Sequence, residues 1–348
     1  MCTDARIIAR DGTIVSARTM EFALPLGSRL VLRPRGSRLT SPAPGGGSGL
    51  SWEARFGSCY LDSMGADAAS DGLNEAGLGI GALYLPGETE YEQVPADEQS
   101  KALSNALFCQ WVLARFGTVN EVKEGLRDVR VWGEPQPLLG GIAVPLHFVV
   151  HDDTGASMVL EWLAGRLHVH DNAVGVLTNC PTFDWHLANL RNYANLTPVN
   201  VSPTTVDGLS FASLGQGSGL LGLPGDPTPP SRFVQTAATL HLAIKPADAH
   251  EALTLAQKIL NRVDIPIGLT RDPGPDGVAH GDRTQWAVIR DHTNRTMYWR
   301  SYHDMTLRCL DLKDAPLSPG DPIRRTPIER AEPTVISVSA DEMSSEAA

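Results

Sequence analysis

Short hydrophobic runs bounded by turn residues recur along the chain, and each of them predicts a β-strand. The first pair, at 7–8 and 14–15, flanks an Asp-Gly turn signal at 11–12, so we expect a hairpin that places Cys2 at the edge or end of a sheet. Turn signals also join several of the later runs, which predicts an antiparallel meander. The later strands are expected over 78–85, 147–150, 158–162, 167–169, 286–289 and 296–302.

Two regions instead space their apolar residues by three and four, which is the period of an amphipathic helix. The first covers 103–114, and a Thr-x-x-Glu capping-box signature at 118–121 then begins another helix. The second covers 231–242, with its first residue, a serine, as the expected N-cap, and resumes over 249–263 after Pro246. Both apolar stripes are expected to pack into the core.

The order of these elements indicates an α+β fold, because strands open and close the chain and the parallel β-α-β alternation is absent. No boundary between domains is visible, so 1–325 is predicted to form one domain. Within it, the segment 187–230 is rich in Gly, Pro, Ser and Asn, which predicts a long ordered loop beside a site. The polar stretch 326–348 is expected to be a disordered tail.

Composition removes several classes of function. The formal net charge of −11 argues against nucleic-acid and membrane-surface partners, which need clustered Lys and Arg. No run approaches the roughly 20 apolar residues of a membrane-spanning helix. The glycine-rich stretch 215–225 lacks the Lys-Ser/Thr ending of a phosphate loop, and the ten histidines show no ligand spacing, so neither a cofactor nor a metal is expected.

The five cysteines are odd in number, widely spaced and without a Cys-x-x-Cys pair. This pattern disfavours both a disulfide framework and a zinc site, and it favours reduced thiols in the cytoplasm. The cysteine pattern leaves a secreted precursor as an alternative to a cytoplasmic protein.

Cys2 carries the most distinctive chemistry in the sequence. Removal of Met1, which is usual before a small residue, would leave a thiol and an α-amine on the same residue. An α-amine has a pKa of about 7.7 to 8.0, so it can serve as a general base close to neutral pH. Nucleophile and base would then share one residue. A cysteine at position 2 is weak evidence alone, and the accompanying sequence decides its meaning.

Four sequence blocks accompany Cys2 in order along the chain. They are Arg-Thr-Met-Glu at 18–21, Asp-Gly-Leu-Asn-Glu-Ala-Gly-Leu at 71–78, Gly-Val-Leu-Thr-Asn at 175–179 with Pro-Thr-Phe-Asp-Trp-His at 181–186, and a last block of Leu-Gly-Gln-Gly at 214–217, Gly-Leu-Pro-Gly-Asp at 222–226 and Ser-Arg-Phe at 231–233. Together with Met-Cys-Thr at 1–3, these blocks resemble the choloylglycine hydrolase family, which includes bile salt hydrolases and penicillin V acylases.

The resemblance implies a fold and an activity. The fold would be the four-layer αββα sandwich of N-terminal-nucleophile hydrolases, often assembled as a homotetramer. The activity would be cofactor-free hydrolysis of a linear amide of a small molecule through an acyl-enzyme, with penicillin V or a conjugated bile salt as the substrate. Two alternatives stay open: an N-acyl homoserine lactone acylase, and a catalytically silent relative that binds acyl amides.

The resemblance also implies roles for residues around the nucleophile Cys2. Arg18 would lie beside the sulfur, where a positive charge favours the thiolate. Glu21 stands where the family usually has an aspartate that holds the α-amine, so the extra methylene implies a slightly different geometry. Arg232 would anchor the carboxylate network around the nucleophile.

The remaining roles concern the oxyanion and the acyl group. The side-chain amide of Asn179 and the backbone N–H of Tyr84 would stabilise the oxyanion. Bile salt hydrolases typically have asparagine at the position of Tyr84, and tyrosine there resembles penicillin V acylases, which modestly favours an aryl acyl group. The predicted acyl-binding residues are Met20, Phe22, Leu24, Leu26 and Tyr84.

Overall fold

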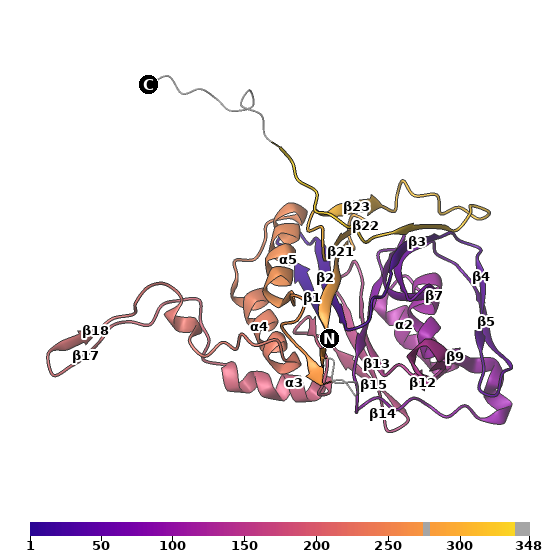
Figure 1. Ribbon diagram of the computed structural model, residues 1–348, viewed down its shortest axis with the longest axis horizontal. Helices are drawn as coiled ribbons and strands as arrows, with labels where there is room; N and C mark the ends of the chain where they lie inside the picture. Colours follow the sequence, from indigo (N-terminus) through magenta and orange to yellow (C-terminus); the bar gives the residue numbers. More distant parts are fainter. Residues whose placement is uncertain (274–278, 338–348) are drawn as a thin grey trace, which may run out of the picture.

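Two antiparallel sheets lie face to face in the computed structural model of the protein, which describes residues 1–273 and 279–337 (Figure 1). The first sheet has six strands in the order β16 (Val176–Leu177), β1 (Cys2–Ile8), β2 (Ile14–Phe22), β21 (Arg283–Asp291), β22 (Thr296–Ser301) and β23 (Arg308–Asp311). The second has eight, in the order β15 (Arg166–Asp171), β14 (Ser157–Leu163), β13 (Leu146–His151), β8 (Gly79–Tyr84), β7 (Ala66–Asn74), β6 (Ser58–Ser63), β3 (Arg29–Arg33) and β24 (Arg324–Pro327).

Helices cover the outer face of each sheet. On one side, α4 (Pro229–Leu242) and α5 (Ala249–Val263) pack on β1 and β2, and α3 (Phe183–Leu190) contacts α4. On the other side, α1 (Phe108–Arg115) packs on β7 and β8, and α2 (Val119–Gly125) follows it. The layers therefore alternate as helix, sheet, sheet and helix, which confirms the predicted αββα sandwich.

Three hydrophobic clusters separate these four layers. The cluster between the sheets contains residues from both of them, among them Met20, Leu83 and Val288. Residues of α5 pack on the outer side of the six-stranded sheet, and α1 packs on the eight-stranded sheet. Burial of apolar area at about 25 cal/mol per Å² makes these interfaces the main source of stability. Cys2 belongs to the cluster between the sheets, so the thiol lies inside the sandwich.

Smaller elements decorate this frame. The strand pairs are β4 (Arg38–Pro42) with β5 (Ser48–Glu53), β9 (Ala102–Ser104) with β10 (Arg130–Trp132), β11 (Pro135–Gln136) with β12 (Ile142–Ala143), β17 (Thr204–Val206) with β18 (Leu209–Phe211), and β19 (Asp272–Pro273) with β20 (Ala279–His280). Figure 1 shows the β17–β18 hairpin projecting from the body on a long arm. Within the described ranges, no helix combines the length and apolarity needed to cross a membrane.

Most predicted strands are present with small shifts in their ends, and the opening hairpin is confirmed as β1 and β2. Cys2 lies at the end of β1, which is flanked by β16 and β2. The helix predicted over 249–263 has these bounds in the structure, because the side chain of Asp248 accepts a hydrogen bond from the Glu251 N–H and so caps its first turn.

Three boundary predictions are wrong. The helix predicted from residue 103 begins at Phe108, since Leu103 belongs to β9. The N-cap predicted at Ser231 lies inside α4, which starts two residues earlier with a pair of prolines that suit the first helical turn. The predicted tail begins in ordered structure, because β24 extends to Pro327 and Ile328 is buried; residues 338–348 lie outside the described residues.

Candidate active site

The β1–β2 hairpin brings Cys2 and Arg18 together. In its register Cys2 lies opposite Met20, and residues two apart on a strand share a face, so Arg18, Met20 and Cys2 all point between the sheets. The Cys2 side chain is 2% exposed and Arg18 is fully buried. Nη2 of Arg18 lies 3.4 Å from Cys2 Sγ, so a positive charge lies beside the sulfur.

Arg18 is held by oxygen atoms on its other side. Nη1 donates to Oδ2 of Asp71 at 3.2 Å and to the carbonyl of Ser70 at 3.1 Å, and Nη2 donates to the carbonyl of Ala82. The guanidinium also lies over the ring of Trp286, 5.2 Å from its centroid. The charge beside the sulfur is therefore fixed in position.

Asn179 connects Cys2 with β8. Its Oδ1 accepts hydrogen bonds from the Cys2 N–H at 2.6 Å and from Nη2 of Arg232 at 2.8 Å. Its Nδ2 donates to the carbonyl of Tyr84 at 2.6 Å. The two predicted oxyanion residues are thus in direct contact, next to the backbone of Cys2.

Arg232 joins the first turn of α4 to β1. Its Nη1 donates to the carbonyl of Cys2 and to Oγ1 of Thr3, and its Nε donates to the carbonyl of Pro227 at 2.9 Å. Among the described residues, Arg232 donates hydrogen bonds to these groups and to Asn179. The resemblance implied that it anchors carboxylates, but none of these partners is a carboxylate. Burial lowers the pKa of Arg232, and the nearby Glu21 and Cys2 raise it.

Glu21 follows Met20 on β2, where a bulge between the two residues interrupts the ladder to β21, and it lines the same pocket as Cys2. Its Oε1 accepts a hydrogen bond from Oγ1 of Thr284 at 2.7 Å, and its buried Oε2 has no hydrogen-bond partner within the described part of the chain. Burial raises the pKa of Glu21, while Arg232 and the N-terminal ammonium act to lower it. The carboxyl group is therefore close enough to both cations to feel their charge.

A buried ionic network continues from Arg18 on the side away from Cys2. Asp71 accepts from Arg18 and lies 3.5 Å from Nη1 of Arg290, and Arg290 in turn pairs with Asp4, which lies 2.7 Å from Nε2 of His151. All of these side chains have zero exposure. This network was not predicted from the sequence, although charged residues inside apolar strands were an available signal.

Arg290 is expected to be essential for stability, because its two carboxylate partners have no access to water. Arg290→Met should lower the free energy of unfolding by about 3 to 5 kcal/mol, the usual cost of breaking a buried ion pair. Urea unfolding measures the change. The matched control is Arg38→Met, since Arg38 pairs with Glu53 on an exposed hairpin and should cost less than about 1 kcal/mol. Equal effects of the two substitutions would contradict the structural role of the network.

A second buried cluster supports Asn179 from the opposite side. Nε2 of His186 lies 2.8 Å from the Asn179 carbonyl oxygen, and Nε2 of His147 lies 3.0 Å from that of Thr178. Nδ1 of His147 contacts Oε1 of Glu161 at 3.0 Å, and Glu161 also accepts from the Phe183 N–H. These contacts fix the backbone that carries Asn179.

Glu161 is expected to make the stability depend on pH. Burial raises its pKa, but the neighbouring imidazoles of His147 and His170 lower it to about 2, from an ordinary value of 4.5. A lowered folded-state pKa contributes stability that is present above pH 4.5 and is lost as the pH falls towards 2. The difference in unfolding free energy between wild type and Glu161→Gln should therefore shrink across this window. A difference that is constant with pH would show that Glu161 does not titrate in this way.

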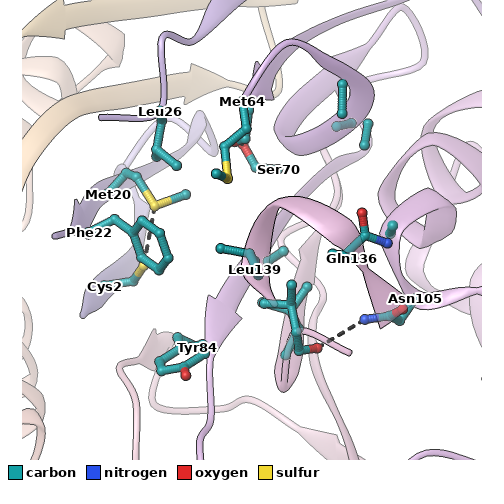
Figure 2. A pocket seen from close by; sticks show the side chains of 18 of the residues that line it. Cys2, Met20, Phe22, Leu26, Met64, Ser70, Tyr84, Asn105, Gln136 and Leu139 are labelled. Atoms are coloured by element: carbon teal, nitrogen blue, oxygen red, sulfur yellow. Dashed lines mark hydrogen bonds between the residues drawn. The ribbon is translucent and has the colours of Figure 1, made fainter. Parts of the chain in front are cut away.

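An apolar pocket opens onto Cys2 between the two sheets (Figure 2). Met20, Phe22, Leu26 and Tyr84 line it as predicted, and the rings of Phe22 and Tyr84 meet edge to face with centroids 6.5 Å apart. Leu24 lies instead in an adjoining surface hollow and is 46% exposed. Other residues that line the pocket were not predicted from the sequence. They are Met64, Ala66, Ala68, Ala69, Leu138, Leu139, Leu146 and Phe148.

Comparison with known proteins agrees with this arrangement. The family model described as "Linear amide C-N hydrolases, choloylglycine hydrolase family" matches residues 2–325. The chain belongs to this family. Its activity is accordingly the hydrolysis of linear carbon–nitrogen amide bonds. The cysteine that the sequence predicts as the nucleophile is present at position 2.

Individual members of the choloylglycine hydrolase family support the same assignment. The chain is 31% identical over 317 residues to a bile salt hydrolase/transferase of Clostridium perfringens, covering 90% of this chain and 92% of that protein. A variant of the conjugated bile acid hydrolase from the same organism has a crystal structure that matches with a TM-score of 0.84 at 29% identity, over 97% of this chain and all of the other. The penicillin V acylase of Agrobacterium tumefaciens shares the fold, with a TM-score of 0.74 at 24% identity over 94% of this chain and 91% of that one.

Proposed function

We propose that the thiolate of Cys2 attacks the carbonyl of an acyl amide after Met1 has been removed. The observation that carries this proposal is the contact of 3.4 Å between Nη2 of Arg18 and Cys2 Sγ at the floor of an apolar pocket. Attack forms a thioester with the acyl group and expels the amine, which takes its proton from the α-amine of Cys2. The α-amine then activates water, which releases the acid.

Two hydrogen-bond donors are proposed for the oxyanion, Nδ2 of Asn179 and the backbone N–H of Tyr84. With Met1 in place, Nδ2 of Asn179 donates to the Tyr84 carbonyl, so this donor must turn towards the substrate oxygen during the reaction. A donor aimed at developing charge is worth about 3 to 4 kcal/mol. Glu21 is proposed to stabilise the protonated α-amine electrostatically, since its carboxyl group lies near the ammonium of Met1, one residue from the nitrogen that becomes the α-amine.

The pocket favours an amide whose acyl group is apolar. Phe22 and Tyr84 supply aromatic walls close to Cys2, and small alanines at 66, 68 and 69 leave room further in. Penicillin V, glycine- or taurine-conjugated bile acids and N-acyl homoserine lactones all carry such an acyl group. Tyr84 modestly favours an aryl acyl group such as that of penicillin V.

The substrate is tested by measuring amine release from penicillin V and from glycocholate, side by side, with protein whose mass shows that Met1 is absent. Release that disappears in Cys2→Ser supports the proposed nucleophile and ranks the two acyl groups. Binding without release, unaffected by Cys2→Ser, would instead favour a catalytically silent acyl-amide-binding protein.

We also propose a homotetramer located in the cytoplasm. The β17–β18 hairpin exposes Val206, Leu209 and Phe211 at its tip, and contact with another copy would cover them. The five cysteines are free thiols, as expected in a reducing compartment. Light scattering measures the assembly, and a monomer at all concentrations would contradict it.

A further inference from the structure

Met1 occupies a defined slot beside Cys2. Its carbonyl oxygen accepts a hydrogen bond from the Glu21 N–H at 2.9 Å, and its ammonium donates to the Glu21 carbonyl at 2.8 Å. The same ammonium donates to Oδ2 of Asp282 at 2.6 Å. Met1 therefore extends β1 along β2, and its positive charge is paired with a carboxylate that is 25% exposed.

This inference rests on the proposed function, which requires the removal of Met1. That removal empties the slot. The carbonyl carbon of Met1 is bonded to the nitrogen of Cys2, so the vacated space begins about 1.3 Å from the nitrogen that becomes the α-amine. This amine must hand its proton to the departing nitrogen of the substrate, and a proton transfer needs heavy atoms within about 3 Å. The leaving amine consequently lies at the entrance of the space that Met1 has left.

The vacated slot keeps three polar groups that Met1 had used. The Glu21 N–H and carbonyl are one donor and one acceptor on the same residue, and the Asp282 carboxylate is an anion aimed at the former position of an ammonium. Asp282 also acts on the rest of the site: burial, Cys180 and Asp282 raise the pKa of Tyr84, and Asp282 opposes the burial that lowers the pKa of Arg232. Because Oδ2 of Asp282 lies 2.6 Å from the Met1 nitrogen, its charge faces the space that Met1 leaves.

We propose that the slot is a subsite for the leaving amine and that Asp282 selects amines carrying a second, cationic group. A short diamine acylated on one nitrogen matches it, because the free ammonium can replace that of Met1 beside Asp282. A charge-assisted hydrogen bond in a partly desolvated position strengthens such binding. Glycine- and taurine-conjugated acyl amides, and penicillin V through the carboxylate of its amine half, carry an anion on the leaving amine instead, so Asp282 should lower their kcat/KM relative to a cationic amide.

Three amides with one acyl group test the proposal. Phenoxyacetyl amides of ethylenediamine, ethanolamine and glycine present a cation, a neutral hydroxyl and an anion at similar distances from the scissile nitrogen. With the processed wild type, kcat/KM should be highest for the cationic amide and lowest for the anionic one, with steps of about tenfold. Asp282→Asn should bring the ratio of cationic to neutral kcat/KM close to one, while Asp282→Glu should preserve it.

A matched control and the pH profile make the test decisive. Glu53→Gln removes a carboxylate from the outer β4–β5 hairpin and should keep the wild-type ratio. A wild type without charge preference, or a preference that survives in Asp282→Asn, would overturn the subsite. An equal loss for all three amides with a shifted pH profile would show that Asp282 serves the α-amine instead. Hydrolysis of none of them would contradict the proposed function, and the subsite with it.

Discussion

Replacing Cys2 with serine is expected to lower kcat for amine release by about 10⁴-fold or more. A serine hydroxyl at this position would face Arg18 as the thiol does, but it has no accessible anion near neutral pH and cannot form the thioester. The buried site has no other cysteine among the described pocket residues that could replace it. Release of the amine by the purified variant, measured under saturating substrate, gives the size of the loss.

The matched control for this variant is Cys180→Ser, which removes a thiol next to Asn179 in the sequence. Burial raises the pKa of Cys180 to about 11, so its thiol stays protonated at neutral pH, and its Sγ contacts the Pro86 carbonyl at 2.9 Å. We expect this variant to keep kcat within a few-fold of wild type. Substantial turnover by Cys2→Ser, or a loss of turnover only in Cys180→Ser, would show that Cys2 is not the nucleophile.

Retention of Met1 is expected to lower kcat by at least about 10³-fold. The nitrogen of Cys2 is then an amide without basicity, and it donates its hydrogen to Oδ1 of Asn179, whereas a free amine could accept and return the proton. Met1 also fills the space that the leaving amine needs. Inhibition of methionine removal during expression gives the retained form, and its kcat is compared with that of the processed protein.

A rescue experiment separates this effect from misfolding. A fusion with a specific protease site directly before Cys2 should be inactive until it is cleaved, and cleavage should restore the full rate. Hydrolysis at the normal rate by the uncleaved protein would exclude the α-amine as the base. If cleaved protein of the correct mass gained no activity, this result would also contradict the α-amine as the base.

The sequence predicted the parts of the fold that local patterns determine. Short apolar runs between turn signals located the strands, and helical periodicity located α5, because these patterns act within one element. The start of α1 was misplaced since Leu103 keeps the apolar spacing of the helix while belonging to β9. Periodicity does not distinguish a buried strand from a buried helix over so few residues.

The candidate site could be predicted only where its residues belong to recognisable blocks. Arg18, Asn179 and Arg232 meet around Cys2, although they are separated by long stretches of chain. Asp282 and Arg290 belong to no such block, and only the pairing of β2 with β21 brings their part of the chain to the nucleophile. Contacts of this kind depend on register and packing, which a single sequence does not contain.

The most direct test of the account is the mass of the enzyme trapped during turnover. Acid quenching in the presence of a slowly hydrolysed phenoxyacetyl amide, followed by mass spectrometry of the intact protein and its peptides, should show one acyl group on a chain that lacks Met1. The acyl group should lie on the peptide that begins with Cys2. An adduct on another residue, such as Cys180, or rapid turnover on a chain that still carries Met1, would contradict it.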